Sequence, residues 1–461
     1  MNHYDLIVIG AGPGGYMAAL EAAKLGLSTA VVESREAGGT CLNRGCIPTK
    51  ALLHAAQVYA EAKNGRASGV IAENLTLDLP AMFAHQQEIT QKLSAGIEAL
   101  FKKGKIALLR GQGTITGAGQ LTVTDETGAV TPYTAERILI ATGSVPALPP
   151  IPGLDLPGVL TSDDLLKGAD RLYDSIVIIG GGVIGVEFAT FYNQLGCKVT
   201  LVEGMDRILP GMDREISQNL ALILKKQGIV IHTSAMVQQV EKTETGLAVA
   251  FIVKDQTTSV EGEVVLCAIG RWPNTNGLFG QGFSLAMEGR RIAVNDRFET
   301  SVPGIYAIGD VSSRVQLAHV ATAQGLACVR QMAEKPDNTD LTLIPGCIYC
   351  RPEIASVGLT EAEAKEAGMN PKVGKSVLFS NARTLIGDLG RSFMKVVANG
   401  DTGAIIGAQL MCQNSTDMIS QLTTAIANGM SPKQLLCFMR PHPTFEEALT
   451  EALEDLAAKL K

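Results

Sequence analysis

The chain has 461 residues, which is too long for one hydrophobic core and predicts about three domains. Its net charge of −7 and its lack of a basic run argue against a nucleic-acid partner. The nine cysteines are too scattered for a secreted disulfide framework. The N-terminus carries no cationic signal segment, and no apolar run is long enough to span a membrane. We therefore expect a cytoplasmic protein.

Residues 5–34 read as an apolar strand, a glycine-rich turn, a helix with small residues on one face, and a second apolar strand. Residues 175–204 repeat this order of elements, and the two segments align without a gap. Each copy has glycines at the three fingerprint positions of its turn and a glutamate 23 residues after the first of them, namely Gly10, Gly12, Gly15 and Glu33, and Gly180, Gly182, Gly185 and Glu203.

This pattern is the fingerprint of a dinucleotide-binding strand–helix–strand unit. The first glycine forms the tight turn, the second admits a pyrophosphate to the helix N-terminus, the third lets helix and strand touch, and the acid binds a ribose hydroxyl. The two copies predict two sites. The carboxylate of Glu203 would repel a 2′-phosphate, so the second site is expected to take NAD(H). Arg207 could pair such a phosphate, but it is expected to cap or form a salt bridge at the surface. The N-terminal site is the natural place for FAD.

Between the two copies, the segment GGTCLNRGCIPTK (38–50) places Cys41 and Cys46 five positions apart. The pair has four interpretations, which are buried small hydrophobes, a structural disulfide, half of a zinc site, or a redox pair. No metal is expected, because zinc needs about four ligands and the nearest histidine, His54, falls in a predicted helix. Pro48 fits the first turn of a helix, which puts Cys46 near a helix N-terminus that favours a thiolate. Two merely buried cysteines remain the alternative.

Two further segments support nested nucleotide domains. Residues 137–146 and 264–273 both end a β-rich stretch with a glycine and then a proline, at Gly143 and Gly270. In 301–325 an apolar strand ends at Asp310, which would lie at the carboxyl edge of a parallel sheet. There it would hold a flavin ribityl or ribose hydroxyl, cap the following helix, or do both.

From about residue 346 the sequence changes character. Three segments look like strands of an antiparallel sheet, followed by a helix from about 416 to 429 and a proline-rich turn into a charged helix. No nucleotide fingerprint occurs there, so a dimerisation domain is the simplest interpretation. Cys347 and Cys350 are expected on one strand, facing opposite sides, and not in a disulfide. His442, with Glu447 five residues later, would by itself be a surface helix start.

The segment GGTCLNRGCIPTKALL resembles the redox-active segment of the class I flavoprotein, or pyridine nucleotide-disulfide, oxidoreductases. The resemblance covers essentially the whole chain, including both fingerprints, AIGD (307–310) and HPTFEE (442–447). It implies an α/β fold with two nested Rossmann-like domains and a C-terminal α+β dimerisation domain. The implied boundaries are 1–147 and 273–345 for the two parts of the FAD-binding domain, 148–272 for the NAD-binding domain, and 346–461 for the dimerisation domain.

The resemblance also implies roles for individual residues. Cys41 would exchange with the substrate, while Cys46 would lie against the flavin as the charge-transfer thiolate. The histidine of an acid/base dyad would reach this disulfide from the other subunit of a homodimer. The remaining implied catalytic residues are the pair Lys50 and Glu187 near the flavin and the dyad His442 and Glu447. The implied cofactor residues are Gly10, Gly12, Gly14, Gly15, Glu33, Lys50, Gly143, Asp310 and Ala318 for FAD, and Gly180, Gly182, Gly185, Glu203 and Gly270 for NAD.

Within the family, the chain most resembles members that oxidise dihydrolipoyl groups, through LAH (317–319), RPEIASVGLTE (351–361) and a C-terminus without a second cysteine pair. The implied partner is a lipoylated carrier, either the acyltransferase of a 2-oxoacid dehydrogenase or acetoin complex or the carrier of glycine cleavage. The alternatives are an NAD(P)H-dependent reductase of another small disulfide, similar to glutathione reductase, and a non-catalytic assembly subunit. Arg44, between the cysteines, and Val320 depart from the family pattern.

Overall fold

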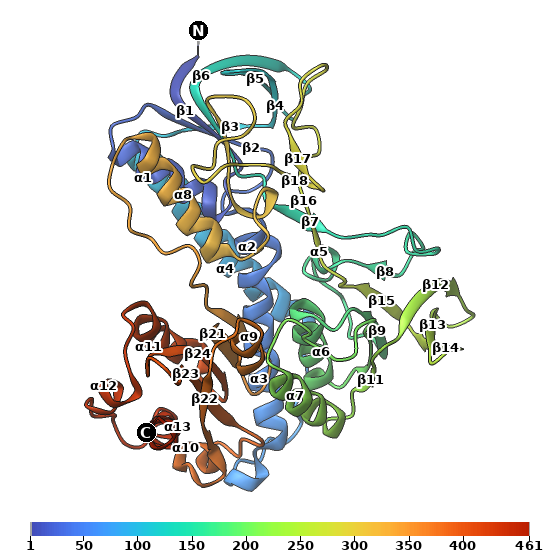
Figure 1. Ribbon diagram of the computed structural model, residues 1–461. Helices are drawn as coiled ribbons and strands as arrows, with labels where there is room; N and C mark the ends of the chain where they lie inside the picture. The colour runs from blue at the N-terminus through green and yellow to red at the C-terminus, as the bar shows by residue number, and fades with distance from the viewer. Residues whose placement is uncertain (1, 461) are drawn as a thin grey trace.

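The computed structural model describes residues 2–460, which form three main sheets joined by helices (Figure 1). The first sheet contains β1 (His3–Ile9), β2 (Thr29–Glu33), β3 (Ala107–Arg110), β4 (Gln112–Gly117), β5 (Gln120–Thr124), β6 (Val130–Ile140) and β19 (Ile305–Ala307). Its order is β3-β2-β1-β6-β5-β4, with β19 also pairing on β6. β1, β2, β3, β6 and β19 are parallel, and β4 and β5 extend the sheet in antiparallel pairing.

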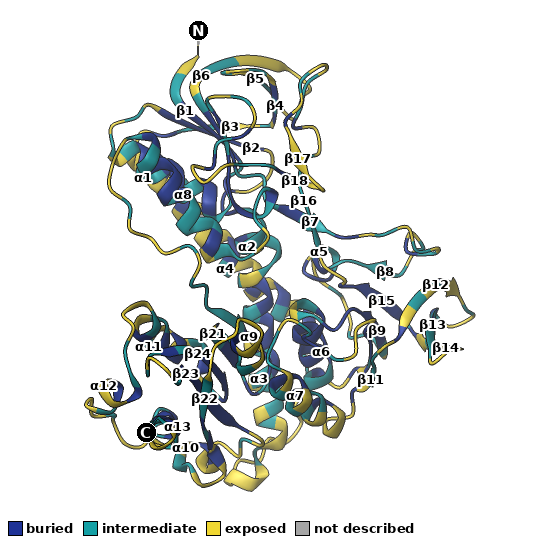
Figure 2. Ribbon diagram, in the orientation of Figure 1, coloured by how far each residue is buried: buried dark blue, intermediate teal, exposed yellow. Residues whose placement is uncertain are grey.

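Two glycines let the helices of this first unit approach each other closely. Helix α1 (Pro13–Lys24) lies beside α8 (Ala318–Met332), although the two are far apart in sequence (Figure 1). A Cβ on Gly14 would lie 2.8 Å from the carbonyl oxygen of Ala321, and one on Gly325 would lie 2.5 Å from the carbonyl oxygen of Gly14. The sheet faces are buried, as near-continuous apolar strands require in a parallel sheet (Figure 2).

The second unit repeats this plan within the first. Its parallel sheet has the order β11-β10-β9-β15-β8 and carries a three-stranded antiparallel sheet beside it. β19 and α8 complete the first unit only after the second has ended, so the expected nested α/β fold is confirmed. The elements are β8 (Val159–Leu160), β9 (Ser175–Ile179), α6 (Val183–Leu195), β10 (Lys198–Val202), α7 (Arg214–Lys226), β11 (Val230–His232), β12 (Met236–Lys242), β13 (Leu247–Val253), β14 (Gln256–Gly262) and β15 (Val264–Cys267).

The third unit is an antiparallel sheet of order β20-β21-β24-β23-β22, covered by helices. The three expected strands and the helix expected at 416–429 are all present. The elements are β20 (Gly346–Ile348), β21 (Ile354–Gly358), α9 (Glu361–Glu366), β22 (Pro371–Val377), α10 (Ala382–Ile386), β23 (Phe393–Asn399), β24 (Ile405–Met411), α11 (Ser415–Ala427), α12 (Pro432–Leu436) and α13 (Glu447–Lys459).

The strand expected to carry both Cys347 and Cys350 is shorter than predicted. β20 ends at Ile348, because the chain turns towards Pro352, which has no N–H group to continue a ladder. Cys350 is buried beyond the strand, where its Sγ donates to the carbonyl oxygen of Pro352 at 3.1 Å. Both thiols are free.

Helices α2 (Gly39–Arg44), α3 (Cys46–Asn64) and α4 (Leu79–Lys103) connect the units. Leu52 and Leu53 of α3 belong to the same buried cluster as Phe188 of α6, so α3 is fixed against the second unit. The first residue of α3 is Cys46, which therefore lies at the junction of the two nucleotide-binding units. The remaining short elements are η1 (Gly65–Ser68), β7 (Ser144–Pro146), α5 (Ser162–Leu165), β16 (Arg271–Pro273), β17 (Met287–Glu288), β18 (Arg291–Ile292), η2 (Gly309–Val311) and η3 (Leu378–Ser380).

Across residues 2–460, no helix has both the length and the apolar character that crossing a membrane requires.

Candidate active site

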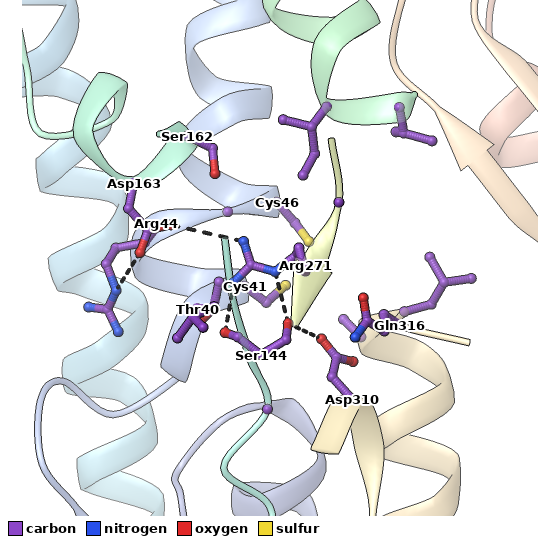
Figure 3. A pocket seen from close by; sticks show the side chains of 18 of the residues that line it. Thr40, Cys41, Arg44, Cys46, Ser144, Ser162, Asp163, Arg271, Asp310 and Gln316 are labelled. Atoms are coloured by element: carbon purple, nitrogen blue, oxygen red, sulfur yellow. Dashed lines mark hydrogen bonds and ion pairs between the residues drawn. The ribbon is translucent and has the colours of Figure 1, made fainter. Parts of the chain in front are cut away.

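One cavity of about 1420 Å³ lies between the two nucleotide-binding units. Both glycine turns and both cysteines of the 38–50 segment contribute to its wall, and Figure 3 shows Cys41 and Cys46 together beside Arg271. The predicted site residues that line it are Gly10, Gly12, Gly14, Glu33, Cys41, Cys46, Lys50, Gly143, Gly180, Gly182, Glu187, Glu203, Gly270, Asp310 and Ala318. Gly15, Gly185, His442 and Glu447 lie elsewhere.

The two glycine turns have nearly the same geometry. Gly10 and Gly180 adopt φ values of +106° and +107°, in the left-handed region that L side chains rarely occupy. A Cβ on Gly15 or on Gly185 would lie 1.9 Å from the carbonyl oxygen of the first glycine of its turn, which explains why neither faces the cavity. The turn and the helix therefore touch in both copies, as the third glycine of the fingerprint allows.

The middle glycines leave open space over two helix N-termini. A Cβ on Gly12, before α1, or on Gly182, before α6, would meet no atom within 4 Å, and both residues line the cavity. Neither helix has a side-chain cap, so its first backbone N–H groups are available. Each end therefore offers a cradle for an anionic group such as a pyrophosphate, and the chain fits one dinucleotide at each turn.

The fingerprint acids are held by backbone groups in the same way in both copies. The carboxylate of Glu33 accepts from the N–H groups of Ala11 and Arg35, both at 2.8 Å. The carboxylate of Glu203 accepts from the N–H groups of Gly181 at 2.5 Å and Met205 at 2.7 Å. Each acid thus ties the end of the second strand to the glycine turn and stays at the cavity wall.

The cysteine pair is asymmetric. Cys41 lies in α2 and is half-buried, whereas Cys46 begins α3 and is open to the cavity. Contact between the two thiols is the largest influence on both, and it lowers the pKa of Cys46 to about 7 while raising the pKa of Cys41. The charge of Lys50 lowers the pKa of Cys46 further. Cys46 is therefore the thiol that ionises in the reduced pair.

Lys50 and Glu187 form an ion pair beside the cysteines. Lys50 Nζ lies 2.9 and 2.8 Å from the two carboxylate oxygens of Glu187, which is almost fully buried. The ring of Tyr349 lies 4.7 Å from the same ammonium, and its backbone N–H donates to Glu187 at 3.1 Å. The pair thus joins α3, α6 and the start of the third unit at the cavity wall.

Asp310 lies beside Ser144 in the same part of the cavity as the cysteines (Figure 3). Burial raises the pKa of Asp310, and its Oδ2 accepts from the hydroxyl of Ser144 at 2.6 Å. The expectation that Asp310 caps the following helix is wrong. It lies within η2, whereas α8 begins at Ala318 with Leu317 as its N-cap, because residues 311–317 separate Asp310 from the helix.

Three residues of the cavity wall escaped the sequence analysis, namely Ser144, Asp163 and Arg271. The Arg271 guanidinium donates through Nε to the Ser144 hydroxyl and through Nη2 to the Ser144 carbonyl oxygen, both at 2.8 Å. A signal was available for two of them, since Ser144 and Arg271 directly follow Gly143 and Gly270. Strands β7 and β16 carry these residues and pair antiparallel at the junction of the units.

The two arginines noted in the sequence are both paired. Arg207 donates to Asp206 and to the carbonyl oxygen of Pro210, both at 2.9 Å, so its expected surface pairing is confirmed. Arg44 Nη1 donates to Glu36 at 2.5 Å.

His442 and Glu447 form a dyad outside the cavity. His442 Nδ1 lies 2.7 Å from Glu447 Oε1, and this bond holds the pKa of Glu447 below its usual value. Glu447 begins α13, and the side chain of His442 is 75% exposed. Within one chain, over residues 2–460, the structure does not bring this dyad to the cysteine pair.

Residues 4–325 match the pyridine nucleotide-disulphide oxidoreductase family, and residues 344–453 match its dimerisation domain. A dihydrolipoyl dehydrogenase of Bacillus subtilis is 40% identical, over 98% of this chain and 97% of that protein. Dihydrolipoyl dehydrogenase 3 of Pseudomonas putida is 38% identical, over 98% of both chains. The solved structure of an HOCl-induced flavoprotein disulfide reductase of Escherichia coli superposes with a TM-score of 0.86 at 28% identity, over 99% of this chain and 100% of that one. The chain therefore belongs to the pyridine nucleotide-disulphide oxidoreductase family, among its dihydrolipoyl dehydrogenases.

Proposed function

We propose that this protein oxidises dihydrolipoyl groups on a carrier protein to lipoyl groups and reduces NAD⁺ to NADH. The observation that carries the proposal is the single cavity that joins the Cys41–Cys46 pair to both dinucleotide fingerprints. FAD and NAD(H) are the cofactors of this enzyme family, and bound FAD supplies the two-electron chemistry that links a dithiol to a hydride acceptor.

Each cofactor has a set of residues suited to hold it. Gly12 and Gly182 leave space for the pyrophosphates at the N-termini of α1 and α6, and Glu33 and Glu203 stand where the riboses would bind. Asp310 and Lys50 line the part of the cavity next to the cysteines. The remaining residues proposed to contact FAD are Gly10, Gly14, Gly15, Gly143 and Ala318, and those proposed to contact NAD are Gly180, Gly185 and Gly270.

The cysteine pair performs the exchange with substrate. A substrate thiolate attacks Cys41 Sγ of the oxidised pair, which breaks the Cys41–Cys46 disulfide and releases Cys46 as a thiolate. The second substrate thiol, once deprotonated, attacks the sulfur joined to Cys41, closes the lipoyl ring and releases Cys41 as a thiol. The thiol acidities favour this order, because Cys46 has the lower pKa, about 7, and is the better leaving group.

The acid/base group would come from a second copy of the chain. His442 removes the substrate's thiol proton and returns it, while the carboxylate of Glu447 orients the ring and favours its cationic form. Its 2.7 Å bond to Glu447, its exposure and its place outside its own cavity support this assignment, as does the matched dimerisation domain. We infer a homodimer that works in the cytoplasm.

Steady-state NADH formation from dihydrolipoamide tests the proposal. Cys41→Ser and Cys46→Ser should each abolish turnover while leaving FAD bound, whereas Cys437→Ser, at an exposed cysteine outside the cavity, should retain it. Substantial turnover in both pocket variants would overturn the mechanism. A parallel panel with glutathione disulfide and CoA disulfide would replace the lipoyl assignment if either substrate exceeded lipoamide.

The carrier is tested separately. Pull-down with the holoenzyme should retain lipoylated proteins, and peptide mass spectrometry of the retained proteins would distinguish a 2-oxoacid dehydrogenase or acetoin acyltransferase from a glycine-cleavage carrier. Recovery of none of these carriers, beside active lipoamide turnover, would reject the carrier assignment and keep the chemistry.

A further inference from the structure

Three alternating charges, those of Arg44, Asp163 and Arg271, form a row along the cavity wall next to the cysteine pair (Figure 3). Arg44 Nη1 lies 2.5 Å from Glu36, and Arg44 Nε lies 3.9 Å from Asp163 Oδ2. The other oxygen of Asp163 lies 4.0 Å from Arg271 Nη1. Arg44 and Arg271 are therefore linked through one carboxylate, although they come from α2 and β16.

The row is shielded from water. The side chains of Arg44, Asp163 and Arg271 are only 17%, 20% and 14% exposed. At such burial, charges several ångströms apart interact more strongly than they do on a surface. Burial lowers the pKa of Arg271, and the negative charges of Asp163, Asp310 and Cys46 oppose this effect. Arg271 is the member of the row that Figure 3 shows beside the cysteines, and Cys46 is among the charges that act on it.

Asp163 lies between Arg44 and Arg271 but is too far from either guanidinium for a hydrogen bond. Its Oδ1 and the Nε of Arg44 are both buried, and among the described residues neither has a hydrogen-bond partner. A carboxylate in this position divides its charge between two cations. If one of the two cations is removed, the whole negative charge of the carboxylate acts on the other.

We propose that Arg44 is a positioning residue that keeps Asp163 from neutralising Arg271, so that the Arg271 charge stays available to the Cys46 thiolate. Arg44 thereby acts on the reactive pair through two intermediate side chains, without touching substrate or cofactor. The inference rests on the proposed use of Cys41 and Cys46 as the redox pair. It gives Arg44, which departs from the family pattern, a place in the reaction.

The other groups that face Cys46 are accounted for. Cys41 faces it from α2, Lys50 from α3, Glu187 from α6 and Arg271 from β16, and Tyr349 lies over Lys50. Lys50 lowers the pKa of Cys46 through its charge, and Glu187 raises it. These groups are unchanged in the variants below, so a shift caused by Arg44 adds to theirs.

The test is the pH dependence of the charge-transfer absorbance between the Cys46 thiolate and FAD in the two-electron-reduced holoenzyme. The wild-type midpoint should lie near the Cys46 pKa of about 7. Arg44→Met should raise it by about 0.7 unit, which lowers the thiolate fraction and the absorbance at neutral pH about threefold. Arg44→Lys should recover part of the shift. Asp163→Asn should move the midpoint in the opposite direction, because it removes the competing negative charge.

Two further variants separate this role from general damage. Arg66→Met removes one positive charge from the exposed η1 and should leave the midpoint unchanged. In an Asp163→Asn background, Arg44→Met should have almost no further effect, as expected for residues that act in series. Additive shifts, or an Arg44→Met midpoint equal to that of the wild type, would overturn the inference. If Arg44→Met fails to fold, Arg44→Lys and Asp163→Asn still decide by the sign of their shifts.

The measurement is independent of the lipoyl assignment. If dihydrolipoamide turnover is absent but the midpoints move as predicted, the proposed function fails and the role of Arg44 stands. If turnover is present and the midpoints do not move, the proposed function stands and the role of Arg44 fails.

Discussion

The ammonium of Lys50 contacts both carboxylate oxygens of Glu187, at 2.9 and 2.8 Å, across 137 residues of sequence. This pair ties the helix that begins with Cys46 to the helix that begins at the second glycine turn. It fixes the thiol relative to the second nucleotide site. The geometry of the cavity therefore depends on a contact between two domains.

Loss of this contact should reduce stability. Lys50→Met leaves the buried Glu187 carboxylate with the Tyr349 N–H as its remaining partner at this site. A buried charge that loses its counter-ion costs about 3–5 kcal/mol, and the partial exposure of Lys50 reduces this cost to roughly 2–3 kcal/mol. Urea denaturation of the holoenzyme measures the loss. The variant Lys63→Met, on the exposed end of the same helix, should change little, and equal stability of the Lys50→Met variant and the wild type would contradict the account.

The Cys46 thiolate should make the stability of the reduced enzyme depend on pH. Its pKa in the folded protein, about 7, is below the usual value of 9.0, so folding favours the ionised form. This contribution is fully present above about pH 9 and is lost as pH falls through about 7. We expect the reduced wild type to gain roughly 1–2 kcal/mol relative to Cys46→Ser between these limits, after allowance for solvent in the open cavity. Urea midpoints of both proteins near pH 6 and pH 9 under reductant measure the difference, and parallel curves would refute it.

The duplicated turns allow a matched pair of substitutions. Gly182→Val places a side chain in the open space above the N-terminus of α6, so NAD⁺ affinity should fall at least tenfold while FAD remains bound. Gly12→Val makes the same change above α1 and should instead abolish FAD retention. Flavin absorbance after gel filtration and the KM for NAD⁺ separate the two outcomes. Loss of FAD from both variants, or from neither, would contradict the assignment of one cofactor to each turn.

Much of this site could be predicted because fingerprint glycines and acids act locally. Gly10 and Gly180 need a backbone conformation that only glycine adopts readily, and Glu33 and Glu203 bind amides of their own turn. The cysteine pair was visible for the same reason, since both thiols lie in one short segment, Cys41 in α2 and Cys46 at the start of α3.

The contacts that escaped prediction are long-range. Arg271 reaches Ser144 across 127 residues, because β7 and β16 pair only once both units have folded. The partner of Arg44 at Asp163 depends on the same junction. The prediction that one strand carries both Cys347 and Cys350 was wrong, because an alternating pattern does not say where the hydrogen-bonded ladder ends. The prediction that Asp310 caps the next helix was wrong, because the sequence did not show how long the loop between them is. The domain boundaries at 147, 272 and 345 stay predictions.

The dyad of His442 and Glu447 should be required for turnover but not for folding or for FAD binding. His442→Gln removes the acid/base group, so kcat should fall by about 10²–10⁴-fold while FAD content and stability stay at wild-type values. The side chain is exposed, so the substitution should leave the fold intact. Stopped-flow kinetics with dihydrolipoamide measure the effect, and a wild-type kcat would remove His442 from the mechanism.

Subunit mixing tests whether the dyad acts across the dimer. Cys41→Ser and His442→Gln homodimers are each inactive, but a heterodimer has one site with an intact pair and an intact histidine. After unfolding and refolding of an equal mixture, activity should return to about one quarter of the wild-type value, since half of the dimers are mixed and each has one working site. No recovery would place both groups in the same chain.

The most direct test of the central claim is to trap the substrate on the cysteine pair. In Cys46→Ser holoenzyme, reduced and then exposed to excess lipoamide, the Cys41 thiolate should open the lipoyl disulfide and form a mixed disulfide, which Cys46 is no longer present to displace and which acid quench preserves by protonating the second lipoyl thiol before it closes the ring. Peptide mass spectrometry after acid quench should locate the adduct on Cys41. An adduct on Cys46 in the Cys41→Ser variant, with none on Cys41 in Cys46→Ser, would contradict the account.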